Sequence, residues 1–450
     1  MRVHRSLARV GWCLLAVPAA GLFAACGSSF TAGDQGPDGG GGGDDAAEDT
    51  VVVVGSDGAA RDGGGGTPDA GDDGPGVPDA FASDGAACAP GDLSCNGSCV
   101  PQNAQNCGTC GNACTTGVAH AHPTCSKGSC SFECDGTFTS CSGACVDLQG
   151  DADNCGACGR SCNGGQCSAG VCQPYVVAMP SNLGRIATDG SNVLYVRTSD
   201  ASLWEVPAAG GTPIELASGG AFDALVVGSG KAFYGQWGTT STLGLATVGS
   251  ANSGATLKTI SGQVTGATMN PSATRYLYTL QGTGSGGAYD CAFGGSCMGA
   301  GSFTPGQVGV AGGDDNDFFY GNYANIEREA LGSGAPTQIE SGSGALNELL
   351  ADGTYVYWAE TNATAITTIY RTLESNPGTP TPIASNAGSF ATDGTTVYFL
   401  SGSSVKSTAA TGGTSVSTVA TEGGNLGAIA MSGKLLLWTY GNTIYGLVLP

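Results

Sequence analysis

The segment Leu350-Ala351-Asp352-Gly353-Thr354-Tyr355-Val356-Tyr357-Trp358 decides the fold of this chain. It reads as a short apolar strand, a tight Asp-Gly turn and a second strand that ends in aromatic residues. Asp-Gly between two apolar runs is typical of a β-hairpin, because the tight turns that join two strands need positive φ angles. The same pattern occurs at Ile186-Ala187-Thr188-Asp189-Gly190 and at Phe390-Ala391-Thr392-Asp393-Gly394. The hairpin is therefore one unit of a repeat.

An aromatic residue near the end of the second strand marks each copy of this repeat. Seven of them follow at intervals of 38 to 44 residues: Tyr195, Tyr234, Tyr278, Tyr320, Trp358, Phe399 and Trp438. A period near 40 residues with about four strands per unit indicates propeller blades. We therefore expect an all-β fold, a seven-bladed β-propeller over residues 173–450, in preference to six or eight blades. These aromatic residues should pack in the core and not line a ligand-binding site.

The two ends of this region predict how the ring closes. After Trp438 the sequence supplies only one further strand, Asn442 to Leu449. The segment Tyr175 to Met179 precedes the first repeat and matches the outer-strand segment Ile214-Glu215-Leu216-Ala217. We expect it to complete the last blade, because closure removes exposed sheet edges.

A duplicated cysteine-rich module is expected over residues 88–172. Its two units have intervening spacings of 6-3-7-2-3-10-4 and 6-3-9-2-3-4-4 residues. An exported chain favours disulfides over zinc or thiol chemistry at the two C-x-x-C pairs. The sixteen cysteines predicted to be oxidised are Cys88, Cys95, Cys99, Cys107, Cys110, Cys114, Cys125, Cys130, Cys134, Cys141, Cys145, Cys155, Cys158, Cys162, Cys167 and Cys172.

Two family resemblances accompany these patterns. The words Asn106-Cys107-Gly108-Thr109-Cys110-Gly111 and Asn154-Cys155-Gly156-Ala157-Cys158-Gly159, with the C-x4-C that follows, resemble the stigma-specific cysteine-rich family. That resemblance implies an extracellular disulfide module without catalytic activity. The segment Ala351 to Trp358 resembles propellers of the YWTD and NHL kind, most of which bind proteins or carbohydrates.

The N-terminus predicts export. Residues 1–26 combine a positively charged start with a short apolar run, and Ala24-Ala25-Cys26 resembles the lipobox of bacterial lipoproteins, although Phe23 replaces the preferred Leu. The resemblance implies lipidation of Cys26, with simple secretion as the alternative. Gly27, where no Asp follows the Cys, points to outer-membrane sorting.

Residues 27–87 are expected to form a disordered linker, because their Gly, Asp and Pro cannot build a core. This stretch contributes -12 to a formal net charge of -22. No basic patch stands out anywhere, which argues against nucleic-acid binding.

Residues 173–450 contain no His, which excludes a Ser-His-Asp triad or a His-ligated zinc within the propeller. The densest acidic stretch holds Asp314, Asp315 and Asp317, a weak calcium candidate for which an exposed acidic turn is the alternative. No other metal or cofactor is expected.

One segment of the third blade stands out as a possible binding loop. Residues Gln281 to Gly306 read as a Gly-rich insertion, within which Cys291 and Cys297 should form a disulfide. A clipped loop on a rigid scaffold is a favoured place for binding, and a merely tolerated insertion is the alternative. The candidate contact residues are Tyr289, Asp290, Phe293 and Met298.

Together these patterns predict an exported, lipid-anchored cell-envelope binding or adhesion protein, anchored at the outer membrane or secreted. It should be a monomer that engages a protein or carbohydrate through one face of the propeller. No catalytic constellation is present, so we do not expect an enzyme. The alternatives are an extracellular propeller-type enzyme that uses carboxylates or a metal, and a purely structural envelope component.

Overall fold

The computed structural model describes residues 88–450, except 238–239, 282–285, 304–308, 323–324, 343 and 414. The expected signal peptide, Cys26 and the linker up to residue 87 lie outside the described residues. All regular structure in the described part is β-strand, and nothing in it forms a helix of the length and hydrophobicity needed to cross a bilayer. The described residues divide into two compact units: residues 137–142 and 146–450 belong to one, and residues 88–136 and 143–145 belong to the other.

The larger unit contains seven four-stranded antiparallel sheets, as the repeat predicts. The blades, with strands in their order within the sheet, are β10 Leu183–Thr188, β11 Asn192–Arg197, β12 Ser202–Pro207 and β13 Ile214–Ser218; β14 Ala221–Gly228, β15 Lys231–Trp237, β16 Ser241–Thr247 and β17 Ala255–Ile260; β18 Gln263–Met269, β19 Arg275–Gln281, β20 Gly286–Ala292 and β21 Cys297–Phe303; β22 Gly309–Gly313, β23 Asp317–Asn322, β24 Asn325–Ala330 and β25 Thr337–Ser341; β26 Ala345–Ala351, β27 Tyr355–Thr361, β28 Thr367–Leu373 and β29 Thr381–Ser385; β30 Phe390–Thr392, β31 Thr396–Ser401, β32 Ser404–Ala409 and β33 Val416–Thr421; β34 Leu426–Ser432, β35 Leu435–Tyr440, β36 Thr443–Val448 and β9 Tyr175–Ala178.

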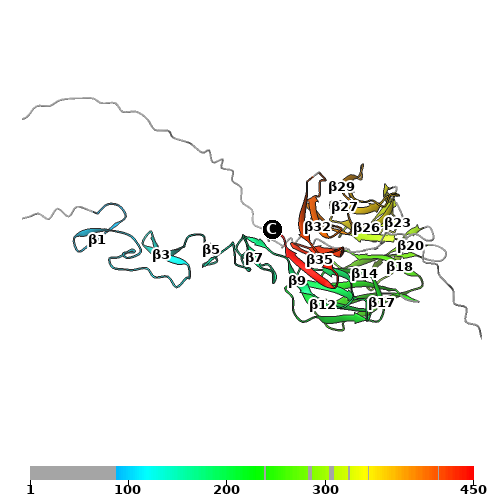
Figure 1. Ribbon diagram of the computed structural model, residues 1–450, viewed down its shortest axis with the longest axis horizontal. Coiled ribbons are helices and arrows are strands. Elements are labelled where there is room, and N and C mark those ends of the chain that lie inside the picture. The colour runs from blue at the N-terminus through cyan, green and yellow to red at the C-terminus, as the bar shows by residue number, and fades with distance from the viewer. Residues whose placement is uncertain are drawn as a thin grey trace, which may run out of the picture. The chain divides into compact units, whose positions relative to one another are not determined.

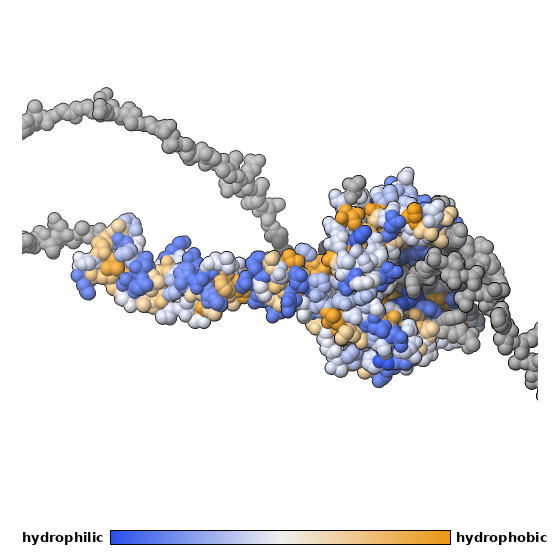
Figure 2. Space-filling view, viewed as in Figure 1, coloured by the Kyte–Doolittle hydropathy of each residue, from blue (hydrophilic) through white to orange (hydrophobic). Residues whose placement is uncertain are grey.

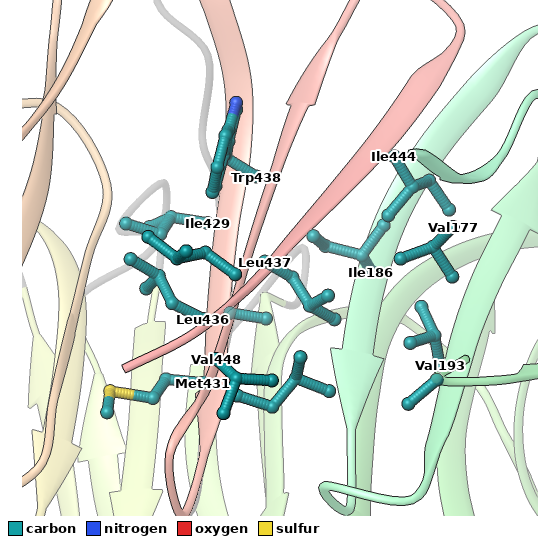
Figure 3. Close-up of a cluster of buried hydrophobic side chains, with 14 of the residues drawn as sticks. Val177, Ile186, Val193, Ile429, Met431, Leu436, Leu437, Trp438, Ile444 and Val448 are labelled. Atoms are coloured by element: carbon teal, nitrogen blue, oxygen red, sulfur yellow. The ribbon is translucent and has the colours of Figure 1, made fainter. Parts of the chain in front are cut away.

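The ring closes as expected. Strand β9 pairs with β36, with Ala178 opposite Ile444 and Tyr175 opposite Gly446. In Figure 1 the teal β9 lies among the red final strands, and the innermost strands β34 and β10 are in contact. Figure 3 shows the core at this junction, where Trp438 and Ile429 of the last blade lie in one cluster with Ile186 of the first.

The Asp residue of the repeat organises the turn between the first two strands of a blade. In four blades, one carboxylate oxygen of this Asp accepts hydrogen bonds from the backbone N–H groups two and three residues later. These residues are Asp189, Asp314, Asp352 and Asp393. Where Gly follows, as at Gly353, its φ of 85° is the left-handed conformation that the turn requires.

The seven repeated aromatics are core residues, as predicted. All lie on the second strand of their sheets, and none is more than 4% exposed. A second aromatic on the third strand stacks on several of them, as in the pairs Tyr278–Tyr289, Trp358–Tyr370 and Trp438–Tyr445. On the visible surface of the propeller, hydrophobic residues occur only in small separate groups (Figure 2).

The disulfide-rich module is confirmed, and both of its units have the same connectivity. Within each unit, the first cysteine pairs with the third, the second with the fifth, the fourth with the seventh and the sixth with the eighth. The pairs are Cys88–Cys99, Cys95–Cys110, Cys107–Cys125 and Cys114–Cys130, then Cys134–Cys145, Cys141–Cys158, Cys155–Cys167 and Cys162–Cys172. The two cysteines of each C-x-x-C pair therefore belong to different disulfides.

Short strands support these disulfides. They are β1 Asp92–Cys95, β2 Ser98–Pro101, β3 Ala121–Ser126, β4 Ser129–Cys134, β5 Thr139–Cys141, β6 Ala144–Val146, β7 Cys167–Ser168 and β8 Val171–Cys172. The second cysteine unit packs against the propeller, because Cys155, Cys162 and Cys172 are at most 1% exposed and belong to the core cluster of the first and last blades. The Arg160 guanidinium also donates a hydrogen bond to the Val448 carbonyl, at 3.5 Å.

Candidate functional site

The innermost strands of five blades share an irregularity beside which polar side chains lie. Strands β10, β14, β18, β26 and β34 each have a β-bulge near their beginning. A bulge leaves one residue unpaired and changes the direction of its side chain, and bulges are frequent beside functional sites. The residues at or next to these bulges include Arg185, Asp223, Thr265, Asn347 and Glu348.

Three charged residues of this set form what we call the axial cluster: Arg185, Asp223 and Glu348. Arg185 lowers the pKa of Asp223 and of Glu348 by electrostatic attraction, partly offsetting the effect of burial. Arg185 belongs to the first blade and Glu348 to the fifth, and these blades are not neighbours in a ring of seven. Strands of these two blades nevertheless bring Arg185 and Glu348 within electrostatic range of each other, as expected for innermost strands around a common axis.

Two carboxylates of the axial cluster have an unused acceptor. Asp223 Oδ2 and Glu348 Oε1 are buried and have no hydrogen-bond partner within the described residues. The other oxygen of Glu348 accepts a hydrogen bond from the Phe390 N–H, at 3.1 Å. A buried acceptor without a donor costs about 1–3 kcal/mol, so a ligand that supplies an N–H or O–H would recover that free energy.

Burial dominates the electrostatics of both acids. It raises the pKa of Asp223, and it raises the pKa of the 3% exposed Glu348 well above its usual value. By contrast, two uncharged residues at the bulges are satisfied within their own blades: Asn347 donates to Thr361, and Thr265 bonds with Thr279. Asp223 and Glu348 are therefore the residues at the bulges that have an acceptor oxygen available for a ligand.

The axial cluster and the second cysteine unit lie toward opposite faces of the ring. The bulges occur near the beginning of the innermost strands, and those strands end at the Asp-Gly turns. The cysteine unit contacts the face that carries the turns: Arg160 bonds to Val448 at the end of β36, and Gly164 approaches Ala209 in the loop after β12. These contacts of the cysteine unit are therefore on the face opposite the axial cluster.

The structure corrects the interpretation of Gln281 to Gly306 as an insertion. The described part of this segment is formed by β20 and β21, the third and fourth strands of the blade. Cys291 and Cys297 are directly opposite each other in these strands and form a disulfide. The high glycine content of the segment is typical of a loop, and it therefore led to the wrong prediction for two regular strands.

The four candidate contact residues of that segment have structural partners. Tyr289 on β20 stacks on Tyr278 at a centroid distance of 5.1 Å, the same role that Tyr370 and Tyr445 have in other blades. Asp290 is fully buried and accepts hydrogen bonds from Arg275 Nε, at 2.8 Å, and the Gly332 N–H, at 2.6 Å.

Phe293 packs against Tyr276 and Phe233, while Met298 lies on β21 beside Gly334. Tyr289, Asp290 and Met298 lie on β20 and β21, and Phe293 begins the short turn between these strands. Packing within the third blade and against its two neighbours therefore accounts for these side chains.

The predicted acidic residues divide into two groups. Asp314 and Asp317 lie together with Glu374, a residue that the sequence analysis missed. Asp315 is directed elsewhere, and its carboxylate accepts hydrogen bonds from Asn270 and the Ser272 N–H in the neighbouring blade. Glu374 could not be found from the sequence because it is about 60 residues away, in the loop that follows β28.

Comparison with known proteins finds solved structures that match part of this chain. No family model matches the chain, and no curated protein matches its sequence. A computationally designed protein, Ika8, has 10% identity and a TM-score of 0.45, covering 60% of this chain and 96% of its own. Virginiamycin B lyase from Staphylococcus aureus has 14% identity and a TM-score of 0.48, covering 62% and 99%. A chain of a nidogen/laminin complex has 10% identity and a TM-score of 0.37, covering 45% and 79%.

Proposed function

We propose that this chain is an exported, lipid-anchored cell-envelope protein that binds a protein or carbohydrate ligand at the axial cluster of its propeller. The observation that carries the proposal is the pair of buried, unpartnered oxygens, Asp223 Oδ2 and Glu348 Oε1, close to Arg185 at the axis. Such a site favours a ligand group rich in hydrogen-bond donors, such as sugar hydroxyls or an amino group.

Binding is proposed in preference to catalysis. Residues 173–450 have no His, so the Ser389 hydroxyl that bonds to Glu348 lacks the imidazole base of a Ser-His-Asp triad. Turnover of the bound ligand by the purified chain would contradict this part of the proposal.

Display at the cell surface is the second part of the proposal. Nine disulfides indicate an extracellular or envelope protein, because such bonds persist in oxidising compartments. A lipid on Cys26 and the acidic residues 27–87 would hold the folded units away from the bilayer. The variant Cys26→Ser should move the protein from the membrane fraction to the soluble fraction, and unchanged partitioning would contradict lipidation.

The binding site is tested with matched carboxylate variants of the full chain. Asp223→Asn and Glu348→Gln replace an acceptor oxygen by an amide and should each weaken binding by about tenfold or more. Glu340→Gln makes the same change on the outer strand β25 and should bind like the wild type. A glycan array and a pull-down from envelope extracts identify the ligand, and titration then gives each affinity. Equal affinities for all four proteins would remove the axial cluster from the proposal.

A further inference from the structure

A second group of buried acids lies between the fourth and fifth blades, apart from the axial cluster. We call Asp314, Asp317 and Glu374 the carboxylate cluster. One carboxylate oxygen from each residue lies within 4.8 Å of the others, and the three residues are only 3–6% exposed. Asp314 and Asp317 flank the turn between β22 and β23, whereas Glu374 follows β28 of the next blade.

The hydrogen bonds of the cluster leave one oxygen free. Asp314 Oδ1 accepts from the N–H groups of Asn316 and Asp317, at 2.7 and 2.8 Å. Glu374 Oε1 accepts from the Gly353 N–H, at 3.1 Å. Asp314 Oδ2 is buried and has no partner within the described residues.

One cation already contacts the cluster, but it does not satisfy this oxygen. Arg328 donates to Asp317 Oδ2, at 2.7 Å, and to the backbone carbonyl of Glu374, at 2.9 Å. If all three carboxylates were ionised, the one guanidinium would leave two negative charges uncompensated. A buried charge excess of this kind needs a proton or a metal ion.

The dimensions suit a hard divalent ion. Calcium takes oxygen ligands at about 2.3–2.6 Å, so two oxygens on opposite sides of one ion are about 5 Å apart at most. The 4.8 Å limit within the cluster meets this condition. A cavity of about 550 Å³, lined by Asp317, Arg328, Thr337 and Ser375 among others, adjoins the site and can hold coordinating water. Smaller Mg²⁺ requires near-octahedral ligands at about 2.0–2.1 Å and fits this spread less well.

We propose that Asp314, Asp317 and Glu374 bind one calcium ion that links the fourth blade to the fifth. Each of the two blades contributes at least one ligand, so the ion acts as a crosslink across their interface. This site is independent of ligand binding at the axial cluster.

The test uses the full chain with its disulfides intact. Calorimetric titration of metal-free protein should show one tight calcium equivalent, and about 1 mM calcium should raise the melting temperature by about 5 °C relative to EDTA. Magnesium at the same concentration should have a much smaller effect. The twelve Asp residues of the linker 27–87 could bind calcium weakly, so the tight equivalent must also be assigned to the cluster by substitution.

Two variants and one matched control make that assignment. Asp314→Asn and Glu374→Gln should abolish the tight equivalent and the thermal shift, while Asp315→Asn, which alters the adjacent carboxylate outside the cluster, should keep both. If Glu374→Gln does not fold, Asp314→Asn carries the test. Absence of a tight equivalent in the wild type, or its persistence in Asp314→Asn, would overturn the proposal. In the first case a proton shared by Asp314 and Glu374 would account for the cluster.

Discussion

A single buried side chain can make the stability of this propeller depend on pH, and Glu329 is such a residue. It is fully buried, and Oε1 accepts a hydrogen bond from the Gly334 N–H at 2.8 Å, while Oε2 has no partner within the described residues. Burial is the main cause that raises its pKa from about 4.5 to about 7. The folded state therefore holds a proton that the unfolded state has already released between these two values.

This shift predicts that stability falls as the pH rises. The contribution of Glu329 is fully present below about pH 4.5 and is lost as the pH passes 7, by about 1–2 kcal/mol after allowance for partial solvation. Denaturant unfolding at pH 5 and pH 8 should show a smaller difference for Glu329→Gln than for the wild type. Glu340→Gln, on the outer strand, should keep the wild-type difference, and an identical pH response in Glu329→Gln would contradict the assignment.

Individual residues also show where the sequence was informative. The seven aromatics were predictable because each repeats at one position of a local pattern, and that position is buried in every blade. The axial cluster was not predictable, because Arg185 and Glu348 are more than 160 residues apart and meet only across a closed ring. The β-bulges beside Arg185 and Glu348 have no recognisable pattern in a single sequence. Glu374 was missed for the same reason.

At the scale of elements, β9 is the strand on which ring closure depends. It is separated in sequence from the rest of its sheet by the other six blades, and it pairs with β36. Val177 is 6% exposed in the core cluster, while its neighbour Val176 is 47% exposed. Adjacent residues on a strand face opposite sides, so these two valines are a natural pair for testing closure.

We predict that Val177→Asp destabilises the propeller by several kcal/mol, because it places an unpaired charge in the core. Val176→Asp should change the free energy of unfolding by no more than about 0.5 kcal/mol, because its side chain is already in contact with water. Urea unfolding followed by circular dichroism measures both. Equal effects of the two substitutions would mean that β9 does not hold the ring closed.

The third blade shows what a disulfide adds to a regular element. Cys291 and Cys297 are opposite each other on β20 and β21, with a Cα–Cα distance of 4.0 Å. The closed loop is short, so replacing both by Ala should cost only about 2 kcal/mol from the greater entropy of the unfolded chain. Calorimetry of the double variant should show a lower melting temperature with native-like ligand binding. A loss of binding with unchanged stability would instead restore the sequence-based interpretation of this segment as a binding loop.

The whole molecule combines two solutions to the problem of stability. The seven blades bury a repeated apolar core, whereas the cysteine units have few large apolar residues and depend on disulfides. Both units have the same connectivity, which the duplicated spacing suggested but did not determine, because eight cysteines allow 105 pairings. The position of Cys172 directly before the closing strand predicts that the module lies at the junction of the first and last blades, and the core cluster there confirms it. The burial of Cys155 and Cys162 in that cluster was not predictable, since it joins them to residues far along the chain.

This packing predicts that equivalent disulfides in the two units have different effects on the propeller. Cys162–Cys172 and Cys114–Cys130 both join the sixth and eighth cysteines of their units. If a disulfide acted only through the entropy of the unfolded chain, Cys114–Cys130 would stabilise the protein slightly more than Cys162–Cys172, because it spans 16 residues instead of 10. However, Cys162 and Cys172 are 0% and 1% exposed within the core cluster of the first and last blades. Replacing both by Ser would put two hydroxyl groups into that core and release the chain that leads into β9.

We therefore expect Cys162→Ser with Cys172→Ser to lower the stability of the propeller by about 2–5 kcal/mol, and Cys114→Ser with Cys130→Ser to leave it nearly unchanged. Tryptophan fluorescence distinguishes the two units, because every tryptophan beyond the expected signal peptide lies within residues 173–450. Denaturant unfolding of the full chain should thus show an earlier transition only for the first double variant. Coincident transitions in both variants and the wild type would mean that the second cysteine unit merely adjoins the ring, and that β9 alone, without support from the disulfides before it, completes the last blade.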